Sequence, residues 1–189
     1  MAPVWEKKMR NRIAAICAGV FAVSGLVVLP ALAQMPASPF TGTLKASYDR
    51  VKVYLTKSAE QMPEANYAFK PTADVRSFGQ LVGHVADANY MMCSAVAGEK
   101  PAGESIEKTK TTKADLEKAL ADSFAYCDKV YAGMNDTAGL QTISFFGGQQ
   151  PKLAVLSFVS NHGFEHYGNM ITYLRLKGLV PPSSQKQGM

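Results

Sequence analysis

Apolar residues recur every three or four positions along four stretches of the chain, which is the spacing of one buried face of an α-helix. In the first stretch, residues 41–62, the apolar positions are Leu44, Tyr48, Val51, Leu55 and Met62. Pro63 ends this predicted helix. Residues 64–75 have few periodic apolar positions and contain Pro71, so we predict a connecting loop there.

The second predicted helix covers residues 78–97 and begins with a capping-box pattern. Ser77 can accept a hydrogen bond from the backbone of Gln80, whose side chain can reach back to the backbone of Ser77. The buried face comprises Phe78, Leu81, Val85, Ala88, Met92 and Val96, and His84 borders it. Residues 98–111 are polar and contain several lysines. We interpret them as a solvated connection whose charges need no functional explanation.

Two further helices are predicted from the same spacing. The third begins near Thr112 and has apolar positions Leu116, Leu120, Phe124, Cys127, Val130 and Met134. A polar loop over residues 135–150 follows. The fourth helix runs from about Pro151 to Lys177, where Gly178 is the expected terminator. Four helices of about 20 residues, with no convincing alternating strand between them, predict an all-α fold, a four-helix bundle.

The first 33 residues have the pattern of a secretory signal peptide. A basic start is followed by an uncharged apolar run over residues 13–29 and by Ala31-Leu32-Ala33, the small residues that a signal peptidase reads. We expect cleavage between Ala33 and Gln34, and a periplasmic or secreted protein. The alternative is an uncleaved anchor, because the apolar run approaches the length that crosses a bilayer. Pro30 and the Ala-x-Ala site favour cleavage.

Cleavage would leave residues 34–189, or 156 of the 189 residues, which is the size of one domain. The whole chain has 20 basic and 15 acidic side chains. Loss of Glu6 and of the four basic residues before the apolar run leaves 16 basic against 14 acidic side chains. This near balance gives no electrostatic case for binding nucleic acid or an anionic membrane.

Two of the three cysteines, Cys93 and Cys127, remain after cleavage. In an oxidising compartment an even pair of cysteines can form a disulfide. The alternative is two small buried side chains on neighbouring helices. The sequence leaves both open, because a bridge requires Cα atoms within about 7 Å of each other.

The chain has only three histidines, His84, His162 and His166. Residues four apart on a helix are surface neighbours, so the rings of His162 and His166 can converge on one metal ion. A histidine on an apolar helix face is more often a core residue than a ligand, but the pair and the interior-facing position of His84 favour a shared site. Three neutral imidazoles suit Zn, Ni, Fe or Cu and leave a coordination position open. Glu165 is expected to point away from this site.

The sequence resembles the DinB-like (DinB/YfiT) metalloprotein superfamily. The resemblance rests on Gly79-Gln80-Leu81-Val82-Gly83-His84-Val85-Ala86-Asp87-Ala88, on residues 161–169 with their His-x-x-x-His, and on residues 173–182 with the Arg-x-x-Gly and prolines. It implies an up-down-down-up four-helix bundle in which His84, His162 and His166 hold a divalent metal, usually Zn or Ni. The chain departs from the family at Tyr167 and Asn169, which changes the rim of the site, and no particular substrate carries over.

The resemblance also implies a metal-dependent enzyme that acts on a small-molecule substrate. The family's characterised branches resemble thiol-dependent transferases and isomerases, and others are suspected hydrolases. Export favours hydrolysis or an unassigned reaction over thiol-dependent transfer, because low-molecular-weight thiols are mainly cytosolic. Tyr167, Asn169 and Asp87 are candidates for contacts around the metal ligands, whereas Tyr90 and Arg175 are expected to be structural.

A function of another class is a non-catalytic, exported metal-binding or stress-associated bundle. Phe145-Phe146 and Met91-Met92 would then belong to a partner surface, for instance that of a homodimer. Packing in the core explains these residues equally well.

Overall fold

The computed structural model describes residues 38–101 and 103–185. The predicted signal peptide and its cleavage position lie outside these residues. Within the described part of the chain, none of the helices has both the length and the apolar character needed to span a membrane.

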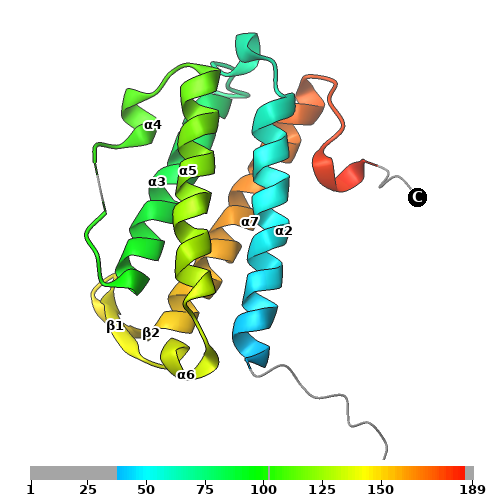
Figure 1. Ribbon diagram of the computed structural model, residues 1–189. Helices are drawn as coiled ribbons and strands as arrows, with labels where there is room; N and C mark the ends of the chain where they lie inside the picture. Colours follow the sequence, from blue (N-terminus) through cyan, green and yellow to red (C-terminus); the bar gives the residue numbers. More distant parts are fainter. Residues whose placement is uncertain (1–37, 102, 186–189) are drawn as a thin grey trace, which may run out of the picture. The chain divides into compact units, whose positions relative to one another are not determined.

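Four long helices form the body of the protein, and they correspond to the four predicted from the apolar spacing (Figure 1). They are α2 (Pro39–Gln61), α3 (Phe78–Ala97), α5 (Lys113–Ala132) and α7 (Lys152–Leu176). The capping box of Ser77 and Gln80 starts α3, and the Thr112 side chain accepts from the backbone N–H of Asp115 at the start of α5. The all-α prediction is confirmed.

The core lies between these four helices and consists of the apolar faces that the spacing predicts. Its largest fully buried side chains include Tyr48, Leu55, Met62, Phe78, Met92, Leu116, Leu120, Phe124, Leu156, Met170 and Leu174. The Tyr48 ring stacks on Tyr131 with centroids 4.3 Å apart, and its hydroxyl donates to the backbone oxygen of Phe124 at 3.0 Å. The polar end of this buried ring is therefore satisfied.

The direction of α3 relative to α7 decides where the histidines meet. Near one end of the pair, the Tyr173 hydroxyl of α7 donates to the backbone oxygen of Arg76, just before α3, at 2.6 Å. Further along α3, His84 lies beside His166 and His162, which precede Tyr173 in α7. The two helices are therefore antiparallel, and their middle turns face each other.

The connections contain short elements that the sequence did not predict. Residues 98–111 include the one-turn helix α4 (Ile106–Thr109), and residues 135–150 include α6 (Asp136–Gly139). An antiparallel hairpin joins β1 (Thr142–Phe145) to β2 (Gly148–Pro151), so the expectation of no strand was wrong. β1, Thr-Ile-Ser-Phe, alternates polar and apolar residues over only four positions, and β2, Gly-Gln-Gln-Pro, has no apolar alternation, so the pair gives no convincing strand pattern. The other described elements are two 3-10 turns, η1 (Glu64–Asn66) between α2 and α3, and η2 (Pro182–Ser184) after α7.

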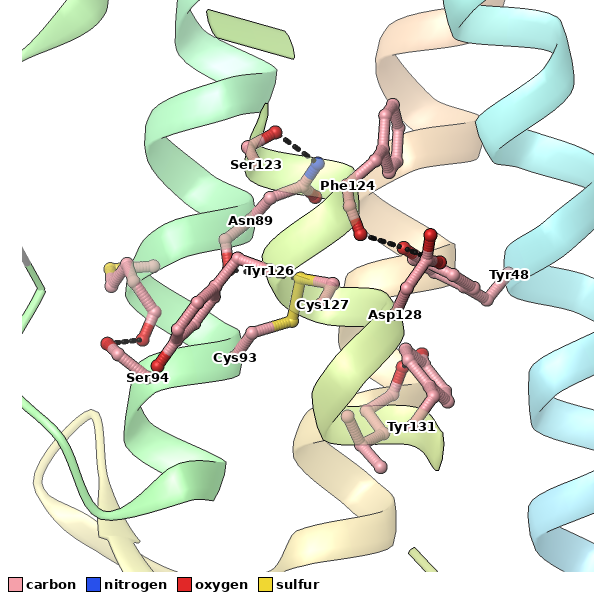
Figure 2. Close-up of a disulfide and its surroundings, with 12 residues drawn as sticks. Tyr48, Asn89, Cys93, Ser94, Ser123, Phe124, Tyr126, Cys127, Asp128 and Tyr131 are labelled. Atoms are coloured by element: carbon pink, nitrogen blue, oxygen red, sulfur yellow. Dashed lines mark hydrogen bonds between the residues drawn. A yellow bond between two sulfur atoms is a disulfide. The ribbon is translucent and has the colours of Figure 1, made fainter. Parts of the chain in front are cut away.

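A disulfide between Cys93 and Cys127 joins α3 to α5 (Figure 2). Their Cα atoms are 5.4 Å apart, and both cysteines are fully buried. One turn earlier, Asn89 of α3 donates to the Ser123 hydroxyl of α5 at 3.2 Å, so the two helices run parallel. The structure therefore has a disulfide at this position and not two free buried cysteines.

Replacing Cys93 and Cys127 together by alanine should lower the free energy of unfolding by roughly 3–4 kcal/mol, because the bridge closes a loop of 34 residues. Urea unfolding of the purified protein measures the loss. A reductant should destabilise the native protein to a similar extent and leave the variant unchanged. A double variant as stable as the oxidised native protein would contradict a stabilising bridge.

Candidate metal centre

Three imidazole rings converge on one point between α3 and α7. Nε2 of His162 lies 3.2 Å from Nε2 of His84 and 2.9 Å from Nε2 of His166. All three residues offer a ligand nitrogen within 4.8 Å of the others. The ring plane of His166 is steeply inclined to the other two, by 86° to His84 and 77° to His162. The structure therefore brings together all three of the predicted site residues.

This donor set fits a divalent metal ion. With metal–nitrogen bonds of about 2.1 Å, two nitrogens on one ion are about 3.0 Å apart at an octahedral angle and about 3.4 Å apart at a tetrahedral angle. The observed separations of 2.9 and 3.2 Å are close to these values. Three converging imidazole nitrogens suit zinc or another borderline metal.

His162 and His166 also have the protonation state that metal binding requires. Burial, with a smaller effect of neighbouring His162, lowers the pKa of His166 to about 3. Burial and the nearby His84 likewise lower the pKa of His162. Both rings are therefore neutral at pH 7, and a neutral imidazole has a nitrogen lone pair available for a metal.

Gly163, between the two histidines of α7, faces α2. A Cβ atom there would lie 3.1 Å from Cγ2 of Val51, so the small residue lets α7 pack closely while both rings turn toward α3. Glu165 is exposed, as expected for a residue that the helix turns about 100° away from His166.

Glu107 was missed by the sequence analysis, which treated the charges of residues 98–111 as needing no functional explanation. Its Oε2 lies 3.2 Å from Nδ1 of His84, and its Oε1 accepts from Nε of Arg76 at 2.8 Å. That interpretation was wrong for this residue. A carboxylate on Nδ1 of His84 favours the tautomer whose Nε2 lone pair is free to point toward the other two histidines.

Asp87 holds the short helix that carries Glu107. Its carboxylate accepts from the backbone N–H groups of Ile106 at 2.7 Å and Glu107 at 3.0 Å, and from the Ser105 hydroxyl at 2.8 Å. Asp87, a candidate for contacts around the metal ligands, thus fixes α4 against α3, and it also lines the cavity that His84 and His162 border.

The remaining candidates, Asn169, Tyr167 and Arg175, lie at different positions relative to the histidines. The Nδ2 atom of Asn169 lies 3.4 Å from Nδ1 of His166, which places Asn169 at the rim. Tyr167 is buried away from the cluster, where its ring stacks on Tyr54 and its hydroxyl donates to Ser183 at 2.7 Å. Arg175 is exposed.

Two cavities flank the histidine cluster. One, of about 710 Å³, has a mixed lining in which polar and charged residues predominate by number; it includes Lys70, Arg76, Gln80, His166, Asn169 and Tyr173. The other, of about 510 Å³, is bordered by His84 and His162 and by apolar side chains. Small molecules could therefore reach the cluster from either side.

The protein is therefore a helical bundle with a candidate metal site formed by histidines of two facing helices, an arrangement that bundles commonly use to hold metals. A family model described as the DinB superfamily matches residues 47–170, and the chain belongs to that superfamily. The resemblance read from its histidine motifs is confirmed. No curated protein matches the chain.

Solved structures show the same fold. A DinB-like protein from Bacillus cereus superposes with a TM-score of 0.64 and 17% identity, covering 75% of this chain and 95% of its own. A DinB-like protein from Bacillus subtilis gives 0.63 and 19%, with 77% and 99% covered. A mycothiol-dependent maleylpyruvate isomerase gives 0.57 and 15%, with 69% of this chain and 60% of that chain covered. At these identities the likeness concerns the fold.

Gly83 permits the contact between α3 and α4, since a Cβ atom there would lie 2.7 Å from Cα and 2.9 Å from the backbone nitrogen of Glu107. Gly83→Ala should therefore lower the free energy of unfolding by about 1–3 kcal/mol. Gly168→Ala is the matched control, because a Cβ atom at this position in α7 has nothing within 4 Å. It should gain about 0.5–1 kcal/mol from the better helix former. Urea unfolding compares the two, and equal stability would show that α4 does not press on Gly83.

Proposed function

We propose that this chain is an exported, metal-dependent enzyme that binds a divalent ion, zinc or nickel, through His84, His162 and His166. The observation that carries the proposal is the convergence of three Nε2 atoms at separations suited to ligands of one ion. Membership of the DinB superfamily supports it. Three protein ligands leave at least one coordination position open, which is typical of catalytic rather than structural zinc sites.

The two flanking cavities support an enzymatic role, because each gives a small molecule access to the cluster. When bound, such an ion lowers the pKa of a water or thiol that reaches its open position. The side chains around the site position its histidines and border its cavities. Glu107 orients His84, Arg76 holds Glu107, and Asn169 lies beside His166 on the polar cavity.

Hydrolysis of a small-molecule substrate is the reaction class that we favour. Water, the second substrate of hydrolysis, is available to an exported enzyme, whereas low-molecular-weight thiols are mainly cytosolic. Thiol-dependent transfer is the second candidate, because one protein of similar fold is a mycothiol-dependent isomerase. Activity of the metal-loaded protein on ester substrates, compared with its activity on electrophiles in the presence of a thiol, separates the two.

Export is supported by the signal-peptide pattern of residues 1–33 and by the bridge between Cys93 and Cys127, since disulfides persist in oxidising compartments. Protein recovered from the periplasm or the medium should begin at Gln34, which mass spectrometry of the intact chain measures. A cytosolic chain that retains its first residues would contradict export.

The purified protein should bind one zinc or nickel ion per chain. Changing any one of His84, His162 or His166 to alanine should remove most of this binding, because two imidazoles hold an ion far less tightly than three. Isothermal titration of the metal-free protein measures affinity and stoichiometry. Glu165→Gln is the control, since this exposed side chain lies between the two histidines of α7. Unchanged metal binding in His84→Ala would refute the three-histidine site.

In the same titration, Glu107→Gln should weaken metal binding by about 10–100-fold, because the amide keeps the size of the carboxylate but loses its charge beside His84. Glu99→Gln is the matched control, an exposed acidic residue in the same connection that lines neither of the two cavities at the histidines. Equal affinities of the two variants would show that Glu107 does not support the site.

A further inference from the structure

An apolar cavity of about 510 Å³ adjoins the histidine cluster on the side away from Arg76. His84 and His162 line one end of it. Most of the remaining wall consists of apolar and aromatic side chains from α3, α7 and the hairpin, namely Ala88, Tyr90, Met91, Met92, Phe146 and Phe158. A volume of this size is within the range of small-molecule sites.

The aromatic wall is continuous with the histidines. Phe158 precedes His162 by four residues on α7, so the two rings lie on one face of the helix, with centroids 6.1 Å apart. The ring of Phe146, from the hairpin, lies 6.2 Å from that of Phe158. On the facing helix, Ala88 follows His84 by four residues and leaves room opposite these rings. A group bound among them would be next to the histidine cluster.

Phe146 and Phe158 are much more exposed to solvent than the aromatic residues of the core. Phe146 is 72% exposed and Phe158 is 41% exposed. Exposed aromatic rings that border a cavity mark a place where an apolar ligand can cover them. Phe146 packs against Phe145, with ring centroids 4.3 Å apart, and this contact still leaves most of Phe146 exposed.

The backbone of Phe146 adds a second, independent observation. Phe146 and Gly147 connect the paired residues Phe145 and Gly148, and both have positive φ, 47° and 78°. Two-residue hairpin turns with this conformation favour Asn-Gly, because a bulky residue at positive φ is strained. An asparagine would serve the turn better than Phe146 does. The phenylalanine therefore has a use other than forming the hairpin.

We infer that this cavity is a subsite for an aromatic group of the substrate, whose reacting polar group lies at the three histidines. Aromatic rings pack well against other ring edges and against methionine sulfur, and both are present here in Phe146, Phe158 and Met91. The inference deepens the proposed function and rests on it for the polar end of the substrate. The apolar end depends only on the cavity.

Two hydroxamic acids test the subsite, because acetohydroxamate and benzohydroxamate have the same metal-binding group and differ in the methyl or phenyl group beside it. Isothermal titration of the zinc-loaded protein should give benzohydroxamate an affinity about tenfold or more above that of acetohydroxamate. Phe146→Asn should remove most of this preference and leave the affinities for acetohydroxamate and zinc unchanged. Because asparagine suits the turn, the variant should melt at the same or a higher temperature.

Phe40→Asn is the matched control, since Phe40 is similarly exposed, at 70%, and is not among the residues that line the cavity. It should keep the full preference for benzohydroxamate. The inference is overturned if the two hydroxamates bind equally to the native protein, or if Phe146→Asn retains the preference.

Failure of the metal site would be recognised separately, because neither zinc nor acetohydroxamate would bind. In that event, benzyl alcohol is titrated into the metal-free protein and followed by the methyl NMR signals of Ala88 and Met91. Shifts in the native protein that are absent in Phe146→Asn would support the aromatic subsite without the metal. No shifts in the native protein would overturn it.

Discussion

The packing of α3 within the bundle is the constraint on which the candidate site depends. One face of α3 is bridged to α5 through Cys93, and the opposite direction of α7 brings His84 against His162 and His166. The glycine before His84 gives α4 the room to reach the same point. Because His84 and the anchor of α4 belong to one helix, a shift of α3 against α7 would separate His84 from His162 and His166, while Glu107, fixed to α3 through Asp87, would move with His84.

The site is asymmetric in charge and polarity. On one side, Arg76 and Glu107 form an ion pair that ends at Nδ1 of His84, and most residues lining the adjoining cavity are polar or charged. On the other, the surface is mainly apolar and includes aromatic and methionine side chains, with Asp87, Glu104 and Ser105 at its polar part. Burial keeps the rings of His162 and His166 neutral between the two. A molecule with one polar and one apolar end matches this arrangement better than a uniformly polar one.

The sequence predicted what periodic patterns encode, namely the four long helices, the capping box at Ser77 and the facing of the three histidines. It also gave the superfamily, because the histidine spacing lies on helices with a recognisable ending. Glu107 could not be predicted, since a one-turn helix has no periodicity and its position depends on bonds to Asp87, about 20 residues earlier. Gly83 precedes His84 in the sequence, but the sequence does not show that Glu107 of α4 packs against this glycine. The hairpin was missed because the alternation of β1 covers only four residues and β2 is polar, so both resemble a loop.

The central claim is that the three histidines hold one metal ion. X-ray absorption spectroscopy of the zinc-loaded protein tests it most directly, because the spectrum reports the atoms bound to the metal. The account predicts a first shell with three imidazole nitrogens at about 2.0–2.1 Å and the rest light atoms from solvent. A shell with fewer than three imidazoles, or one containing sulfur, would contradict it.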